Sequence, residues 1–127
     1  MSATQALLET SLEPLLDDGF LAGLAHDIGA DGAVEATRIF AEDAPGRMAR
    51  MREAAVVNTA VARREAHALA GSARAVGLRR LGEAAGAMQR ALENGRADQA
   101  ALPRLEPLLR QSLAALAAWQ AAQPAFT

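Results

Sequence analysis

The sequence of 127 residues is 51% hydrophobic, has a formal net charge of −2 and contains no cysteine. This length fits one domain with one core. The near balance of charge argues against a general nucleic-acid-binding protein, and the lack of cysteine excludes disulfides and thiolate metal sites. The sequence also shows no membrane-spanning apolar run and no signal-peptide pattern, so we expect a cytoplasmic protein.

The apolar residues are mostly Ala and Leu, and aromatic residues make up only 3%. Ala and Leu are strong helix formers, and no segment alternates with the period of two that is typical of a strand. The composition therefore predicts an all-α protein. Short connections between its helices favour antiparallel neighbours in a bundle.

The first two helices are separated by a glycine. A helix over about residues 14–29 ends at Gly29, because glycine accepts the left-handed conformation found just past a helix. Asp31 can cap the next helix, in which Pro45 and Gly46 predict a kink or an irregular turn. The apolar positions assigned to these two helices are Leu15, Leu16, Phe20, Leu21, Leu24, Ile28, Val34, Ile39, Phe40, Met48, Met51 and Ala55.

The third and fourth helices lie on either side of a second glycine. Asn58 and Thr59 provide a break and a cap before a helix over about 59–76. Gly77 separates this helix from the next, which covers about 78–93. The apolar positions of the fourth helix are Leu78, Leu81, Ala85, Met88 and Leu92.

The last helix follows the stop signal Asn94-Gly95 and begins near Asp98 or Ala101. Pro103 suits its first turn, whereas Pro107 suggests a later start as an alternative. Its apolar positions are Leu102, Leu105, Leu109, Leu113, Leu116 and Trp119, and Phe126 is assigned to the tail.

The third helix carries the candidate functional residues. At about 100° per residue, five of its small or apolar residues fall within one narrow stripe that must face the core. These residues are Ala62, Ala66, Leu69, Ala73 and Val76. His67 lies roughly 140° from the stripe, so its ring should point to solvent. Gly71 lies one turn after His67 on the exposed side.

Two features of this exposed side have no obvious purpose in folding. Gly71 costs about 1 kcal/mol relative to Ala in a helix, and its use would be to let another surface approach the imidazole. Arg63, Arg64 and Arg74 would attract and hold a phosphoryl group or a phosphorylated partner. A neutral imidazole is also a nucleophile. These residues alone leave three interpretations open: a phosphoryl acceptor, an anion-binding surface, or an ordinary solvated face.

The segment from Ala66 to Gly77, AHALAGSARAVG, resembles the signature of histidine phosphotransfer (Hpt) domains, which reads roughly A-H-x-L-K-G-S-[SA]-x-x-x-G. The match covers Ala66, His67, Leu69, Gly71, Ser72, Ala73 and Gly77. Upstream, the segment IFAEDAP at residues 39–45 resembles the F-x-x-D-A-P stretch of the family's second helix. The resemblance covers about residues 15–120, with the helices in the expected order.

This resemblance implies an antiparallel up-down four-helix bundle with a short additional N-terminal helix. It implies one Hpt domain over residues 1–127, with a core of about 15–120 and short flexible ends. His67 matches the phosphorylated histidine, and Gly71 matches the glycine that leaves room for a receiver domain. The protein would accept a phosphoryl group from one receiver aspartate and pass it to another.

The resemblance also implies the partners, namely response-regulator receiver domains and a hybrid histidine kinase, with no nucleic acid and no membrane. We expect a monomer and a free-standing chain. The chain would be a phosphocarrier and not an enzyme with turnover, because no ATP-binding kinase domain is visible. No metal or cofactor is expected on this chain, since magnesium would be held by the partner receiver domain.

Two positions depart from the family pattern. Ala70 stands where the family usually has a lysine that is thought to interact with the phosphoryl group, so the positive charge must come from Arg63, Arg64 or Arg74, although arginine and lysine are not interchangeable. We expect a docking surface of small residues near Gly71 and Ala70 with an arginine rim. Met88-Gln89 replaces a common Leu-Glu pair, and we expect this change to matter little.

Two alternative functions stay open. The first is a degenerate Hpt-like adaptor that binds receivers without carrying phosphate, which the missing lysine favours. The second is an enzyme that uses His67 as a general base, but no second nucleophile or carboxylate lies convincingly near it, and Glu65 points well away. His26 is interpreted as a residue of the helix surface.

Overall fold

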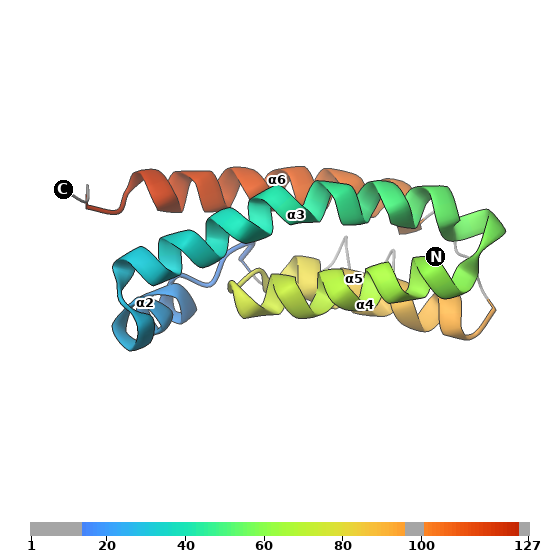
Figure 1. The fold of residues 1–127 in the computed structure, drawn as a ribbon, viewed down its shortest axis with the longest axis horizontal. Helices are drawn as coiled ribbons and strands as arrows, with labels where there is room; N and C mark the ends of the chain where they lie inside the picture. The colour runs from blue at the N-terminus through green and yellow to red at the C-terminus, as the bar shows by residue number, and fades with distance from the viewer. Residues whose placement is uncertain (1–13, 96–100, 125–127) are drawn as a thin grey trace.

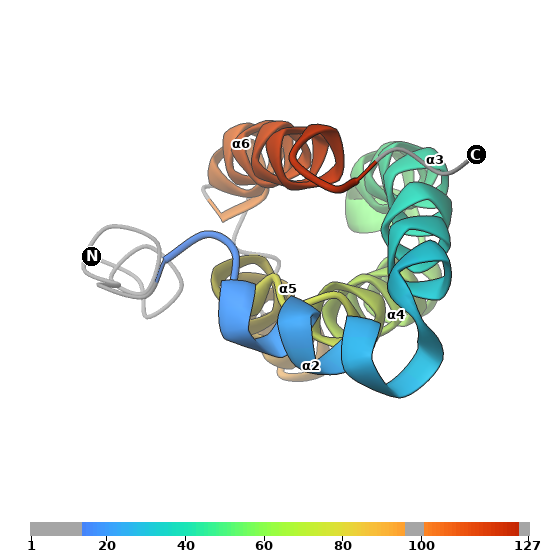
Figure 2. The same cartoon turned by 90° about the vertical axis from the view of Figure 1, so that its left-hand side faces the viewer.

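The structure, a computed structural model, describes residues 14–95 and 101–124. Within this part of the chain five helices and no strands occur: α2 (Asp18–Ile28), α3 (Ala30–Val57), α4 (Thr59–Ala75), α5 (Arg79–Glu93) and α6 (Ala101–Ala121). The long helices lie side by side along the molecule (Figure 1). Seen from one end, α3, α4, α5 and α6 form a four-helix arrangement, and α2 lies across the near end in front of α4 and α5 (Figure 2). The predicted all-α bundle with a short additional helix is confirmed.

The connection between α3 and α4 is a single residue, Asn58. Its side-chain oxygen accepts a hydrogen bond of 3.3 Å from the Val61 N–H in the first turn of α4. Its own N–H donates to the Ala54 carbonyl at the end of α3, at 2.8 Å. Asn58 therefore ends one helix and begins the next, as predicted, and the short link makes α3 and α4 antiparallel neighbours.

Gly77 lies in the turn between α4 and α5 and also contacts the start of α2. Its φ of 79° lies in the left-handed region, and a Cβ there would come within 3.2 Å of both the Asp17 carbonyl oxygen and the Phe20 ring. The Asp17 N–H donates to the Gly77 carbonyl at 2.9 Å. The Asp17 carboxylate accepts from the Phe20 N–H at 2.9 Å and pairs with Arg79 at 3.2 Å. Only glycine fits this junction without strain.

The centre of the bundle is formed largely by small side chains of α4 and α5, and larger side chains from α3 and α6 complete it. The stripe predicted for α4 is buried throughout, and it packs against the buried face of α5. The buried residues of these two helices and their connection are Ala62, Ala66, Leu69, Ala70, Ala73, Val76, Gly77, Leu78, Leu81, Gly82, Ala84, Ala85, Gly86, Ala87, Met88 and Leu92. Small residues allow two helix backbones to approach closely, so α4 and α5 form the tightest pair of the bundle.

Polar contacts join α3 to its neighbours. Glu65 of α4 accepts from Arg47 at 3.2 Å and from Arg50 at 3.0 Å, and its side chain is only 15% exposed. On the α6 side, Gln120 donates to the hydroxyl of the buried Thr37 at 2.8 Å. These contacts hold α3 between α4 and α6. Glu65 is thereby directed to α3, away from the surface that carries His67.

Helix α3 continues through Pro45, so the predicted irregular turn at Pro45-Gly46 is wrong, whereas the alternative of a kink stays a prediction. Proline removes one backbone hydrogen bond inside a helix and costs about 3 kcal/mol. The exposed Pro45 is followed and preceded by buried residues, among them Ala44 and Met48. Burial of this apolar face in successive turns keeps the helix continuous across the proline.

Several predicted details at the N-terminal side also differ. Helix α2 begins at Asp18 and not near residue 14, because Asp17 caps it. Asp31 lies in the first turn of α3 instead of capping it, and Gly29 occupies the cap position. Ile28 and Ile39, which were assigned to apolar faces, are each 53% exposed. For Ile39 the reason is that its neighbour Phe40 occupies the buried face, about 100° around the helix.

At the C-terminal side, α6 runs through Pro107, so the alternative of a later start is wrong, and Pro103 lies in its first turn as predicted. Trp119 packs partly buried against the core. The predictions for Asp98, Phe126 and the flexible ends lie outside the described residues. None of the described helices combines the length and apolar character that crossing a membrane requires.

The continuity of α3 predicts that Pro45→Ala stabilises the protein. Alanine restores the missing helical hydrogen bond, so we expect the free energy of unfolding to rise by about 1–3 kcal/mol in urea denaturation followed by circular dichroism. The matched control is Pro103→Ala, which removes an exposed proline from a first turn, where no such bond is lost, and should change stability by less than about 0.5 kcal/mol. A loss of stability in Pro45→Ala would contradict the argument.

Candidate functional site

His67 lies midway along α4 with its side chain at the surface. Its neighbours Ala66 and Leu69 are fully buried, whereas His67 itself is exposed. The predicted exposure of the ring is therefore confirmed. The residues that follow His67 by three and by seven positions, Ala70 and Arg74, lie on the same side of α4, the side that borders α5.

The imidazole of His67 is held by Gln89 of α5. His67 Nδ1 lies 3.1 Å from the Gln89 side-chain oxygen, and the amide nitrogen of Gln89 donates to a Glu93 carboxylate oxygen at 3.0 Å. An ionised carboxylate only accepts hydrogen bonds, so the amide must present its NH₂ to Glu93 and its oxygen to His67. The Nδ1 atom is then the donor. In the neutral ring this leaves the lone pair on Nε2.

The expectation that Gln89 in place of Glu matters little stays a prediction, but the contact between Gln89 and His67 was not expected. Sequence reasoning missed the contact because His67 and Gln89 are 22 positions apart. A usable signal did exist: both residues lie at similar distances from the turn at Gly77, and antiparallel helices joined by a tight turn bring such positions together. The signal requires that the turn be located first.

Gly71 lies one turn after His67 and is exposed. A Cβ at Gly71 would meet no atom of the described chain within 4 Å, and its φ is not in the left-handed region. Neither packing within the chain nor backbone conformation therefore requires a glycine here. Alanine would be the better helix former, so the glycine leaves open space beside the imidazole at a cost to helix stability.

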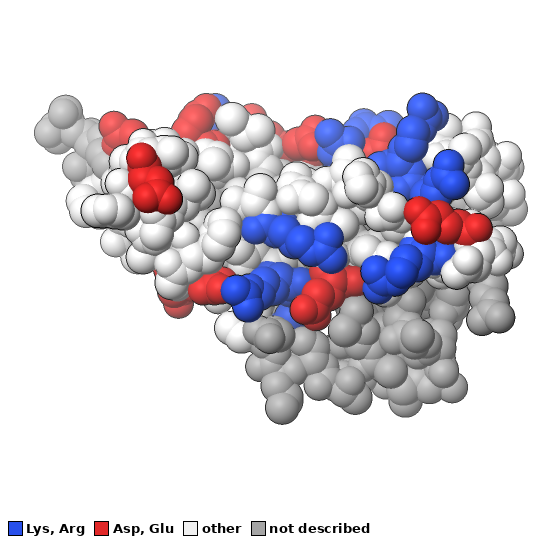
Figure 3. Space-filling model, turned by 90° about the horizontal axis from the view of Figure 1, so that it is seen from below, with Lys and Arg blue, Asp and Glu red and all other residues white. Residues whose placement is uncertain are grey.

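The three arginines predicted around His67 are all exposed on α4. Many other arginines of the chain are held by carboxylates, as in the pairs of Arg38, Arg47, Arg50, Arg52 and Arg79. Within the described residues, no ion pair or side-chain hydrogen bond engages Arg63, Arg64 or Arg74. Figure 3 views the molecule from the side of α4 and α5, and basic side chains gather across the middle of this face with fewer acidic ones between them.

Ala70 does not belong to the exposed surface, which corrects the docking surface predicted around it. Its side chain is only 2% exposed, and its carbonyl oxygen lies 3.4 Å from the point that a Cβ on Gly82 would occupy. The close approach of α5 covers this position. The arginines and Gly71 remain at the surface, whereas Ala70 is part of the contact between α4 and α5.

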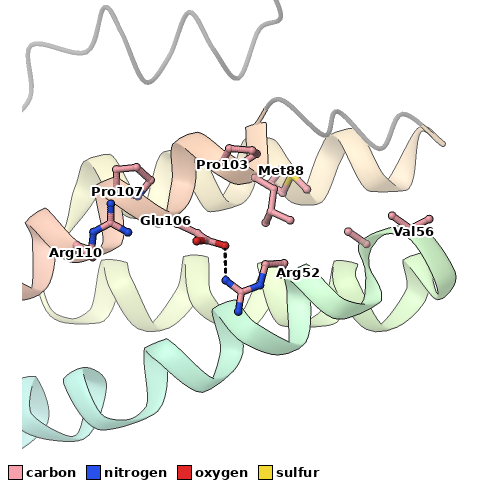
Figure 4. Close-up of a pocket in the computed structure, with 9 residues that line it drawn as sticks. Arg52, Val56, Met88, Pro103, Glu106, Pro107 and Arg110 are labelled. Atoms are coloured by element: carbon pink, nitrogen blue, oxygen red, sulfur yellow. Dashed lines mark hydrogen bonds and ion pairs between the residues drawn. The ribbon is translucent and has the colours of Figure 1, made fainter.

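A pocket of about 440 Å³ lies elsewhere, between the end of α3 and the beginning of α6, with Met88 of α5 in its lining. The ion pair between Arg52 and Glu106, 2.8 Å long, spans this pocket (Figure 4). His67 does not line it. Among the described residues, no cluster of three or more His, Asp or Glu side chains is arranged to hold a metal ion.

These observations define a class of protein: a helical bundle that presents one oriented histidine at its surface. A comparison with protein-family models matches the Hpt domain over residues 35–119, about two thirds of the chain, and the chain belongs to this family. Searches of the curated proteins and of the solved structures found no significant match. Hpt domains are four-helix bundles that act in phosphorelays with receiver domains, as phosphocarriers and not as catalytic enzymes.

The hydrogen bond from His67 predicts a measurable preference between the two neutral forms of the ring. In the wild type, the nitrogen chemical shifts of the neutral imidazole should show a proton on Nδ1 and none on Nε2. Gln89→Ala removes the acceptor, so both forms should become populated. Gln111→Ala, an exposed glutamine of α6, is the matched control. Identical nitrogen spectra for Gln89→Ala and the wild type would contradict the assigned role of Gln89.

Proposed function

We propose that His67 accepts a phosphoryl group from the phospho-aspartate of one receiver domain and passes it to the aspartate of another. The observation that carries this proposal is the hydrogen bond between His67 Nδ1 and Gln89, which leaves Nε2 of an exposed ring as the nucleophile. Gly71 supports it, because the open space beside the ring admits a partner surface. The donor would be a receiver domain linked to a hybrid histidine kinase, and the chain would act as a monomer, since α4 and α5 supply every group named here.

In the proposed reaction, the Nε2 lone pair attacks the phosphorus in line, a P–N bond forms, and the P–O bond to the receiver aspartate breaks. The aspartate leaves as a carboxylate. Attack places positive charge on the imidazole ring, and the Nδ1–H bond to Gln89 stabilises this charge as it develops. In the second transfer, a carboxylate attacks phosphorus and the neutral imidazole leaves. Magnesium would be held by the receiver domain, which is where the charge of the phosphoryl group needs compensation.

The adaptor function remains the alternative, and the alanine at position 70, where the family usually has a lysine, is the observation that favours it. Without a lysine at this position, an Hpt-like surface could bind receivers and hold no phosphate. The two functions make opposite predictions about covalent labelling, so one experiment separates them.

The labelling experiment uses a receiver domain phosphorylated by a small-molecule phosphodonor, and also potassium phosphoramidate, which phosphorylates imidazoles without a partner. With the phosphorylated receiver as donor, acid-labile phosphate should appear on the wild type and disappear in His67→Gln, because the nucleophile is lost. His26→Gln is the matched control, since His26 is an exposed histidine of α2 and its loss should leave labelling by the receiver unchanged. A receiver that binds the wild type without ever labelling it would establish the adaptor instead.

Gly71→Ala should change the stability of the protein and its rate of phosphoryl transfer in opposite directions. Because a Cβ at this position has no neighbour within 4 Å, the free energy of unfolding of the variant should be about 0.5–1 kcal/mol higher than that of the wild type. The added methyl group intrudes on the partner surface, so the transfer rate from a phosphorylated receiver should fall about tenfold or more. Labelling by phosphoramidate, which needs no docked protein, should stay unchanged. Equal receiver transfer rates for variant and wild type would show that the open space is not used.

A further inference from the structure

The side chain of Arg74 lies in a groove that two buried glycines of α5 leave open. A Cβ on Gly82 would come within 2.7 Å of the Arg74 Cγ, and a Cβ on Gly86 would come within 3.0 Å of its Nη2. The stem of Arg74 therefore crosses Gly82, and its guanidinium lies over Gly86. Any larger residue at either glycine would displace this side chain.

The groove directs the guanidinium of Arg74 toward His67. Helices α4 and α5 are antiparallel, so the order Gly82, Gly86, Gln89 along α5 leads back along α4 to the histidine that Gln89 contacts. Gly86 precedes Gln89 by three residues, which is a rise of about 4.5 Å. The tip of Arg74 therefore lies about one helical turn along α5 from the residue that contacts His67.

A second arginine reaches the same point. The Nη1 atom of Arg90 lies 3.6 Å from the position of a Cβ on Gly86, so the guanidinium groups of Arg74 and Arg90 both lie over this glycine. Glu83 lines a hollow together with Arg74, but no ion pair joins them, and no carboxylate among the described residues pairs with Arg90. Two neighbouring cations without a counter-charge repel each other, and an anion between them removes this cost.

We propose that Arg74, with Arg90 beside it, binds the phosphoryl group on His67 and replaces the lysine that Ala70 has displaced. This inference rests on the proposed function. All 13 basic residues of the chain are arginines, so no lysine can serve. Arg74 is favoured over Arg63 and Arg64 because its side chain is already held against α5. A side chain that is held before binding loses less conformational entropy when it binds a ligand.

The test compares two ways of removing Arg74 from its place. Arg74→Ala removes the charge, whereas Gly82→Ala keeps the charge but displaces the side chain and also favours the helix. Each protein carries His26→Gln, so that His67 is its single histidine, and is loaded with phosphoramidate before transfer to a receiver domain is timed. Transfer should fall about tenfold in both variants, the value of one charge-assisted hydrogen bond, and the double variant should lose no more than either single one. Arg74→Lys should restore part of the rate.

Two further measurements exclude a merely structural effect. In the loaded wild type, the nearby guanidinium favours the dianionic phosphoryl group, so its ionisation midpoint in a phosphorus NMR titration should rise in Arg74→Ala. Arg110→Ala removes the same charge from the exposed side of α6 and should change neither the rate nor the midpoint. If Gly82→Ala does not fold, Gly86→Ala displaces the same guanidinium at 3.0 Å.

The outcomes separate the two proposals. Failure of a phosphorylated receiver to label His67 of the wild type overturns the proposed function. Normal loading of the wild type, with transfer rates and midpoints in Arg74→Ala and Gly82→Ala equal to those of the wild type, overturns the role of Arg74 alone.

Discussion

The close approach of α4 and α5 is the constraint on which the site depends. It requires small residues on both sides of the contact, and Ala70, Gly82 and Gly86 supply them. The turn at Gly77 then sets which residues of the two helices face each other. This register places Gln89 against His67 and leaves Arg74 a groove in which to lie. Bulky residues at the same positions would separate the helices and remove both contacts, even if His67 stayed exposed.

Helix α4 serves stability and chemistry with different faces. Its stripe of small and apolar residues is buried in the core, whereas His67, Gly71 and Arg74 lie at the surface where α4 borders α5. We call this exposed border the seam. The seam contains features that a purely stable helix would avoid, namely an exposed glycine at Gly71 and arginines without a counter-charge. Such features cost stability, and the tight packing of the other face offsets that cost. A substitution in the seam can therefore change transfer while the bundle remains folded.

Sequence reasoning succeeded where a local signal determines the structure. Asn58 and Gly77 mark helix ends through their own backbone and side-chain chemistry, and the stripe of α4 places His67 at the surface by helical geometry alone. It failed where packing between elements decides. The continuity of α3 across Pro45 depends on the burial of the residues around it, and the contact of Gln89 with His67 depends on a register that no single helix contains.

The position of the phosphate-binding charge follows from the same packing argument. A lysine at position 70 would have to leave the contact between the helices, where Ala70 is almost completely buried. The tight contact between α4 and α5 and a lysine at position 70 therefore exclude each other. Gly82 and Gly86 of α5 leave space beside α4. The side chain of Arg74, one turn after Ala70, lies in this space and extends toward His67. The proposed site then includes Gly82 and Gly86 as well as His67, since these glycines determine where the guanidinium of Arg74 lies.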